Sequence, residues 1–328
     1  MSWRVLVTAR GFDATPEAGA LLERAGCALV PSPYGGARFD HELGGDDLVA
    51  LLRDADAYVA GSAAITRDVL ERAPALKLIS RRGVGFERID LDAARERNIL
   101  VTITTGVNQH AVADHVFALI LAAGRRIVDA HRCVSEGGWT PFSGPELHGK
   151  TLGIIGLGRV GKGVALRARG FGMRVIASDP VKDEVFAREN GVEYVALEAL
   201  LPGSDAVSVN CSLNETTRGL LDRRALSLMK PGSIFVNTAR GGIVDETALA
   251  DALRAETIRA AGIDVFEREP PLGSPLLGHP NIVLTPHIAA YTDEANVASN
   301  VLAAQIVVDY MQGRLPEPDC VIVAPNGV

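Results

Sequence analysis

Residues 152–179, LGIIGLGRVGKGVALRARGFGMRVIASD, contain the pattern that decides the fold. An apolar run ends in a Gly-x-Gly-x-x-Gly turn at 156–161, a helical pattern follows, and a second apolar run ends at Asp179. This order of strand, glycine turn, helix and strand is typical of the unit that binds dinucleotides. An ordinary βαβ turn without a ligand is the alternative, and the glycines alone do not exclude it.

Each glycine of this turn has its own physical role. Gly156 permits the tight turn, Gly158 lets the backbone approach a pyrophosphate, and Gly161 lets the helix pack close to its strand. The pyrophosphate is expected at the helix N-terminus, where N–H groups and the helix dipole favour negative charge. Asp179 stands where a carboxylate can accept hydrogen bonds from ribose hydroxyls, so the sequence predicts a dinucleotide site.

The composition is typical of a globular protein of about two domains. The chain has 328 residues, of which 47% are hydrophobic and 22% charged. The net charge of −7 and the dispersed Lys and Arg residues argue against a nucleic-acid surface. No Cys or His spacing is typical of a metal site. The N-terminal apolar run is too short for a signal peptide or a membrane span, so we expect a cytoplasmic protein.

Strand-like and helix-like segments alternate along both halves of the chain. In the first half, strands are expected at 5–7, 57–60, 76–80 and 100–104, and helices at 46–53, 66–73 and 90–97. A further helix is expected to begin at Pro16, with Thr15 as its N-cap. In the second half, strands are expected at 152–155, 174–178, 206–209, 233–237, 260–263 and 282–284, before a helix from about 292 to 312. The alternation predicts two parallel sheets covered by helices.

A connecting region separates the two halves. Residues 108–127 are apolar and helix-like, but His110, Asp114 and His115 interrupt them, so a membrane helix is not expected. Residues 129–149 are expected to be irregular. Long irregular segments are usually functional or part of an interface.

Three polar residues follow strands of the second half, where open α/β sheets bind ligands. Arg240 precedes two glycines and suits a carboxylate or a ketone oxygen. His287 is suited to proton transfer, and a carboxylate such as Glu269 would stabilise its protonated form. Taken singly, each has a simpler interpretation: a surface arginine, an exposed turn glutamate and a structural histidine.

From about residue 57 to 314 the chain resembles the D-2-hydroxyacid dehydrogenase family, which includes phosphoglycerate, glyoxylate/hydroxypyruvate and D-lactate dehydrogenases. The motifs that carry the resemblance are GVGFERIDL at 83–91, VNQHAVADH at 107–115, GIIGLGRVG at 153–161, VNTARGGIVDE at 236–246, GIDVFEREPP at 262–271 and VLTPHIA at 283–289. It implies an NAD-dependent oxidoreductase that interconverts a D-2-hydroxy acid and its 2-keto acid by hydride transfer.

The resemblance also implies an architecture. Two Rossmann-like domains, each a doubly wound parallel sheet, would place the active site in the cleft between them. The substrate-binding domain would comprise 1–103 and 289–328, and the NAD-binding domain 104–288. Family members are usually homodimers, and the interface here would be roughly 108–149.

Residue roles follow from the same resemblance. Arg240, Glu269 and His287 would be catalytic: His287 exchanges a proton with the C2 oxygen, Glu269 orients it, and Arg240 holds the substrate. N–H groups of Val84 and Gly85 would bind the substrate carboxylate. The implied NAD contacts are Gly156, Gly158, Arg159, Val160, Gly161, Asp179, Cys211, Thr238, Ala239 and Asp264.

Two other functions remain open on the sequence: a non-enzymatic, NAD-sensing protein that resembles a corepressor, and a phosphite dehydrogenase-like activity. Formate oxidation is disfavoured, because formate dehydrogenases carry glutamine where Glu269 stands. Phosphoglycerate dehydrogenases tend to carry an arginine within 59–66, and none is present here.

Overall fold

The computed structural model describes residues 2–34 and 40–325. The chain forms two compact units. The first unit comprises residues 1–108 and 292–328, and the second comprises 109–291. The sequence places the boundaries at 103/104 and 288/289, and the assignment of substrate to the first unit stays a prediction.

The first unit is built on a six-stranded sheet in the order β13-β5-β4-β3-β1-β2. The strands are β1 (Arg4–Val7), β2 (Ala28–Val30), β3 (Ala57–Ala60), β4 (Leu78–Arg81), β5 (Leu100–Ile103) and β13 (Val321–Val323). All neighbours are parallel except β13, which runs antiparallel to β5. The strands β2 and β13, each of three residues, were not predicted from the sequence.

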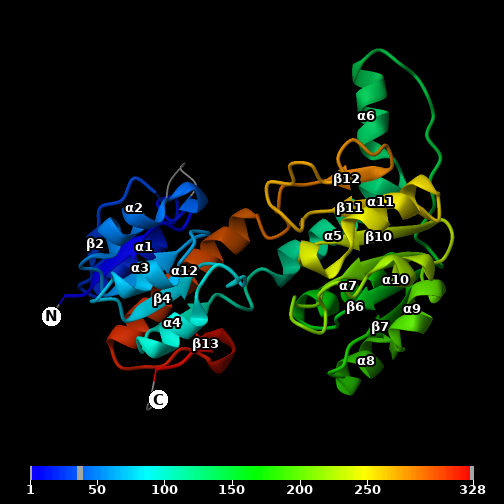
Figure 1. The fold of residues 1–328 in the computed structure, drawn as a ribbon. Coiled ribbons are helices and arrows are strands. Elements are labelled where there is room, and N and C mark those ends of the chain that lie inside the picture. Colours follow the sequence, from blue (N-terminus) through cyan, green and yellow to red (C-terminus); the bar gives the residue numbers. More distant parts are fainter. Residues whose placement is uncertain (1, 35–39, 326–328) are drawn as a thin grey trace. The chain divides into compact units, whose positions relative to one another are not determined.

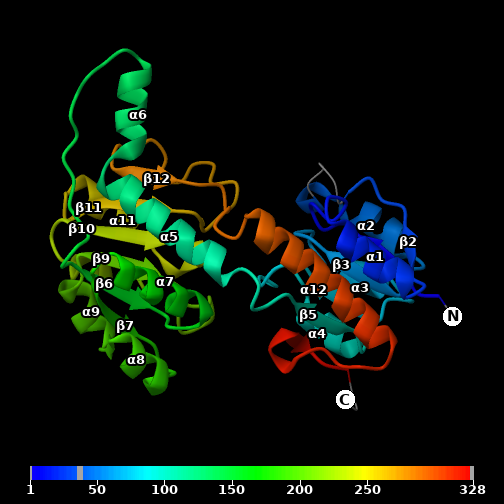
Figure 2. The same ribbon diagram turned by 180° about the vertical axis from the view of Figure 1, so that it is seen from behind.

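Helices cover both faces of this sheet (Figure 2). They are α1 (Pro16–Arg24), α2 (Gly45–Leu52), α3 (Arg67–Glu71), α4 (Leu91–Glu96) and α12 (Asp293–Met311), with short 3₁₀ turns at Asp40–Glu42 and Pro318–Cys320. One core layer lies between the sheet and α1 with α12, and another lies under α2, α3 and α4. Both faces of the strands are therefore buried, which is why they are nearly continuous apolar runs.

Thr15 precedes α1 as expected, but its side chain does not cap the helix. The hydroxyl donates instead to the carbonyl of Gly11 at 3.1 Å and accepts from Asn300 at 2.9 Å. The expected side-chain cap is wrong, because a buried partner on α12 competes for the hydroxyl.

A buried carboxylate joins the loops at the carboxyl ends of β1 and β3. Asp40 is 2% exposed and accepts hydrogen bonds from the Thr8 hydroxyl, the Ser62 N–H and the Ser62 hydroxyl, each at 2.8 Å. A Cβ atom at Gly61 would overlap this carboxylate, lying 2.7 Å from its carbon. From β1 the chain passes to β2 on one side and then to β3 on the other, so β1 and β3 flank the switch point of the sheet. Open α/β sheets bind ligands in the crevice at this point, and here Asp40 fills it.

The second unit is built on a seven-stranded sheet in the order β12-β11-β10-β9-β6-β7-β8, with every neighbouring pair parallel. The strands are β6 (Thr151–Ile155), β7 (Arg174–Ser178), β8 (Val192–Tyr194), β9 (Ala206–Val209), β10 (Ser233–Asn237), β11 (Ile258–Ile263) and β12 (Ile282–Leu284). Of these, only the three-residue β8 was not predicted.

Helices cover both faces of the second sheet (Figure 1). They are α5 (Gln109–Gly124), α7 (Arg159–Gly170), α8 (Glu184–Asn190), α9 (Leu197–Gly203), α10 (Arg223–Ser227) and α11 (Glu246–Arg254), with a 3₁₀ turn at Gly241–Ile243. The helix α6 (Ile127–Ser135) belongs to the same unit but does not cover the sheet. One core layer holds α5 and α7, and the other holds α9, α10 and α11. Among the described residues, no helix has the length and apolar character needed to cross a membrane.

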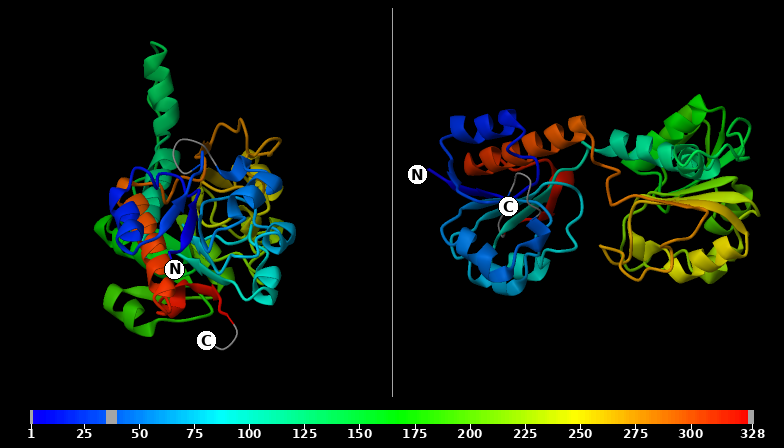
Figure 3. Two further views of the ribbon diagram at one scale, coloured as in Figure 1. Left: turned by 90° about the vertical axis from the view of Figure 1, so that its left-hand side faces the viewer. Right: turned by 90° about the horizontal axis from the view of Figure 1, so that it is seen from above.

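The helix α6 corrects the expectation that 129–149 is irregular throughout. It begins at Ile127, directly after Arg126 in the left-handed conformation with φ of 54°. None of its residues is buried, and it projects away from the sheet of its unit (Figure 3). Ile127–Ser135 is amphipathic, but it was assigned to an irregular segment because glycines and prolines follow it closely, from Gly137 to Pro145.

Candidate active site

The glycine turn lies between β6 and α7, and its three glycines meet different surroundings. A Cβ at Gly156, where φ is +91°, would lie 2.6 Å from the backbone nitrogen of Cys211. A Cβ at Gly161 would overlap the carbonyl oxygen of Gly156, so helix and strand approach closely there. A Cβ at Gly158 would meet nothing within 4 Å, so this backbone borders open space that a ligand can enter.

Asp179 follows β7 and is tied to the glycine turn. Its carboxylate accepts a hydrogen bond from the N–H of Leu157 at 2.7 Å and another from the N–H of Val181 at 2.8 Å. The half-buried carboxylate is therefore fixed beside the turn. Each oxygen keeps a lone pair that can accept from a ribose hydroxyl.

Two further loops carry predicted cofactor residues. Cys211 follows β9, and burial, with a smaller contribution from the charge of Asp179, raises the pKa of its thiol to about 11, so the thiol is neutral. Thr238 follows β10 and is 8% exposed. Within the described residues, its hydroxyl oxygen is buried without a hydrogen-bond partner. A buried hydroxyl is expected to be paired, so a ligand at this edge would satisfy it.

The loop that carries Arg240 is organised by Asn237, the last residue of β10. The Asn237 amide donates to the Arg240 carbonyl at 2.9 Å, and its oxygen accepts from the Ala239 N–H at 3.0 Å. Arg240 is half-buried, and its guanidinium donates to the Ala239 carbonyl at 2.7 Å. The sequence analysis assigned no role to Asn237, although its place at a strand end was a usable signal.

Glu269 and His287 form a pair. His287 Nδ1 lies 2.8 Å from Glu269 Oε2, and Glu269 Oε1 accepts from the Phe266 N–H at 3.1 Å. Burial acts to raise the pKa of Glu269, but its hydrogen bond to His287, the charges of His287 and Arg240, and the Phe266 N–H outweigh burial and lower the pKa. Glu269 is therefore ionised at neutral pH and can orient and stabilise a protonated imidazole.

Asp264 lies beneath His287 and is fully buried. The hydroxyl of Thr285 and the N–H groups of Ile288 and Ala289 donate to its carboxylate at 2.6, 2.8 and 2.9 Å. Burial acts to raise the pKa of Asp264, but these bonds and the proximity of His115 lower it. The expected contact between Asp264 and the nicotinamide amide stays a prediction.

Apart from Val84 and Gly85, every predicted site residue lies in the second unit, and all follow carboxyl ends of its strands or begin α7. Val84 and Gly85 follow β4 in the first unit and are half-buried. The neighbouring Gly83 N–H donates to the Thr104 hydroxyl at 2.7 Å, which shapes their turn. Their contact with a substrate is not tested and stays a prediction.

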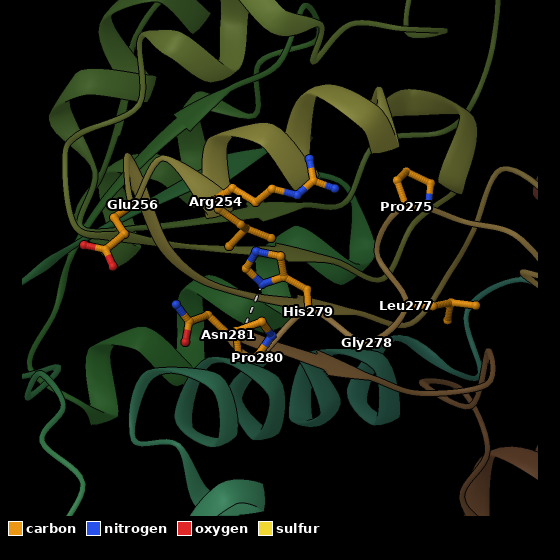
Figure 4. Close-up of a pocket in the computed structure, with 9 residues that line it drawn as sticks. Arg254, Glu256, Pro275, Leu277, Gly278, His279, Pro280 and Asn281 are labelled. Atoms are coloured by element: carbon orange, nitrogen blue, oxygen red, sulfur yellow. Dashed lines mark hydrogen bonds between the residues drawn. The ribbon is translucent and has the colours of Figure 1, made fainter.

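A separate hollow of about 420 Å³ lies at the opposite, amino-terminal edge of the second sheet (Figure 4). It is lined by residues just before β11 and β12, including Arg254, His279 and Asn281. Burial, followed by the charge of Arg254, lowers the pKa of His279. None of the predicted site residues lines this hollow. Within residues 2–34 and 40–325, no group of three His, Cys, Asp or Glu side chains could hold a metal ion.

Comparison with known proteins identifies the family. The family model "D-isomer specific 2-hydroxyacid dehydrogenase, NAD binding domain" matches residues 117–289. The glyoxylate reductase of Korarchaeum cryptofilum is 42% identical over 278 residues, which cover 83% of this chain and 81% of the relative. The chain belongs to the D-isomer specific 2-hydroxyacid dehydrogenase family. The resemblance seen in the sequence is confirmed, and so is the fold of two Rossmann-like units.

Other family members differ in length and in the substrate that their names give. The D-3-phosphoglycerate dehydrogenase of Mycobacterium tuberculosis is 43% identical over 281 residues, covering 85% of this chain but 53% of the relative. This chain thus spans about half the length of the phosphoglycerate dehydrogenases it matches. The D-lactate dehydrogenase of Aquifex aeolicus, solved with NAD and lactic acid, has a TM-score of 0.82 and 29% identity and covers 98% of this chain and 100% of that one.

The second unit is therefore the domain of this family that binds a nicotinamide cofactor. Its residues fit such a group. Gly158 borders open space at a helix N-terminus, Thr238 has an unsatisfied hydroxyl among the described residues, and Asp179 holds acceptors beside the turn. An ordinary βαβ turn without a ligand, the alternative left open by the sequence, is not favoured.

Proposed function

We propose that this protein is an NAD-dependent oxidoreductase that interconverts a D-2-hydroxy acid and its 2-keto acid. The observation that carries the proposal is the His287–Glu269 pair, 2.8 Å apart, at the carboxyl edge of a sheet that also carries a dinucleotide turn. An acid–base pair beside a nicotinamide site is what a reversible carbonyl reduction requires.

NAD, when bound, supplies the hydride acceptor, and its reduced form supplies the hydride. His287 Nδ1 faces Glu269, so Nε2 is the nitrogen available to the substrate oxygen. In reduction, a protonated His287 gives its proton to the oxygen of the new hydroxyl, and in oxidation the neutral ring removes it. The negative charge of Glu269 stabilises the protonated form of the His287 ring.

Arg240 is proposed to bind the substrate. A guanidinium can donate to both a carboxylate and the reacting ketone oxygen. The Asn237 bonds and the following glycines fix its backbone; a Cβ at Gly241 would overlap the chain at Phe266. The N–H groups of Val84 and Gly85 are proposed as further donors to the substrate carboxylate.

The cofactor is proposed to be NAD(H) rather than NADP(H). Asp179 would lie at the adenosine ribose, where its negative charge opposes a 2′-phosphate. Two backbone N–H groups hold the carboxylate, so it cannot easily turn away. The nearest following cation, Lys182, is exposed and lies over the Tyr194 ring, 5.5 Å from its centroid.

A second copy of the chain is proposed as a partner, bound through roughly 108–149. The helix α6 buries none of its residues, while Ile127, Val134 and Trp139 are 55%, 56% and 89% exposed. Apolar side chains gathered on a projecting helix and the segment after it are typical of an interface. A cytoplasmic location and the absence of nucleic-acid contacts stay predictions from the sequence.

The proposed function is tested by following NADH oxidation with glyoxylate, hydroxypyruvate, pyruvate and longer 2-keto acids. Turnover with at least one of them, lost in His287→Ala, is expected. Tight NADH binding without turnover of any keto acid would instead support the NAD-sensing alternative, and NAD reduction by phosphite alone would support the phosphite alternative. The comparisons favour neither, because the relatives named above are dehydrogenases and a reductase.

A further inference from the structure

The backbone at His287 adopts a conformation that its surroundings must impose. Its φ is +54°, in the left-handed region that residues other than glycine seldom occupy. Such a residue persists there only where neighbouring contacts hold it. The His287 N–H donates to the carbonyls of Asp264 and Thr285, at 2.9 and 3.1 Å, which supplies part of that restraint.

The Asp264 carboxylate supplies the rest. Thr285 donates to it from two residues before His287, and Ile288 and Ala289 donate from the two residues after it. The carboxylate therefore holds the chain on both sides of His287. The direction in which the imidazole points, and hence its contact with Glu269, depends on this clamp.

The helix α5 brings one more side chain, His115, to the buried carboxylate of Asp264. His115 Nε2 lies 3.6 Å from Asp264 Oδ1 and 3.1 Å from the Thr285 hydroxyl oxygen. The single proton of that hydroxyl is donated to Asp264, so the hydroxyl must accept a hydrogen bond from His115. Because His115 Nε2 donates this hydrogen bond, Nε2 must carry a proton.

We propose that His115 is a positioning residue for His287. By donating to Thr285 and lying beside Asp264, it fixes the clamp that keeps the His287 ring against Glu269. No described contact joins His115 to His287 or Glu269, so its effect passes through the clamp. The expected effect on turnover rests on the proposed function, whereas the effect on the His287 ring does not.

The test compares three variants: His115→Leu, His115→Gln and His110→Leu. Leucine cannot donate to Thr285, whereas the glutamine amide can reach the place of Nε2. His110 lies on the same helix and is exposed, so its variant is the matched control. In protein with ¹⁵N-labelled histidine, ring shifts above the titration range report which nitrogen holds the proton. Signals of His287, one of seven histidines, are identified by their absence in His287→Gln.

In the wild type, His115→Gln and His110→Leu, the His287 proton is expected on Nδ1, facing Glu269. In His115→Leu it is expected to move to Nε2, with kcat for the keto acid reduced about tenfold, equivalent to about 1.4 kcal/mol. The KM for NADH should change less than kcat does, since the glycine turn and Asp179 are untouched.

Thr285→Val breaks the same link without changing His115 and should reproduce the tautomer change if His115→Leu does not fold. An unchanged tautomer and turnover in both variants would overturn the proposal. So would equal losses in His115→Gln and His115→Leu, which would indicate a purely structural role. Absence of keto-acid turnover in the wild type would refute the proposed function, while the tautomer comparison would still decide the role of His115.

Discussion

Replacing Glu269 by glutamine should move the pH dependence of keto-acid reduction to lower pH. The charge of Glu269 lies 2.8 Å from the His287 ring. At that separation Coulomb's law gives about 6 kcal/mol at an effective dielectric of 20 and about 1.5 kcal/mol at 80. The side chains are 39% and 47% exposed, so solvent screening favours the lower value. About 1.4 kcal/mol corresponds to a displacement of about one pH unit.

The direction follows from the chemistry of the pair. A negative neighbour favours the protonated ring, which reduction requires, so its loss lets the ring deprotonate at lower pH. The assay is kcat/KM for keto-acid reduction against pH, in wild type and Glu269→Gln. Glu267→Gln, an equal charge change at an exposed residue two positions away, is the control. If kcat/KM falls at the same pH in Glu269→Gln as in the control, Glu269 does not stabilise the protonated ring.

Four further outcomes are expected. The wild type should prefer NADH over NADPH about tenfold, equivalent to about 1.4 kcal/mol, and Asp179→Ser should reduce this preference. The measurement is the ratio of kcat/KM with NADH to kcat/KM with NADPH. Arg240→Ala should lose about 1.5–3 kcal/mol of substrate binding in kcat/KM, with NADH affinity unchanged by titration. Sedimentation should show a dimer for the wild type and a monomer for Ile127→Asp. Because the pKa of Asp264 is lowered in the folded state, its carboxylate should stabilise the fold above about pH 4 and lose this effect in acid. The measurement is the Tm of wild type and of Asp264→Asn as a function of pH.

Each of these outcomes has a result that contradicts it. Equal use of NADPH by the wild type would reject the role of Asp179. Loss of NADH binding together with a much lower Tm would make Arg240 structural. A monomeric wild type would reject the proposed dimer. Leu272→Asp is the control, because Leu272 is 80% exposed and lies outside 108–149. Equal dissociation in this control would reject the proposed interface. Parallel acid melting curves for wild type and Asp264→Asn would show that Asp264 contributes no pH-dependent stability.

Most of the fold could be predicted because its strands are buried on both faces. Such strands form continuous apolar runs, as in Leu152–Ile155, and glycine turns mark their ends. Of the three-residue edge strands, β12 was predicted, whereas β2, β8 and β13 were not. The helix α6 is amphipathic but was not predicted, because the glycines and prolines that follow it marked the whole segment as irregular.

The catalytic candidates could be named from motifs because each lies in a loop that follows a strand. The clamp around His287 could not be predicted in the same way. His115 and Thr285 are 170 residues apart, and neither residue type in isolation indicates a role. Their contact exists because α5 packs on β11 and β12, so it became visible only in three dimensions.

The place of Asp40 has a consequence for how this chain can change. Any side chain at position 61 would overlap the Asp40 carboxylate, which ties Thr8 to Ser62. An arginine at position 61, within the loop where phosphoglycerate dehydrogenases tend to carry one, would therefore displace the Asp40 carboxylate. A larger residue at position 61 requires the Asp40 side chain to move or to be replaced, and either change gives up its bonds to Thr8 and Ser62. The two positions are therefore coupled, and a library that randomises position 61 alone should return glycine more often than one that also randomises position 40.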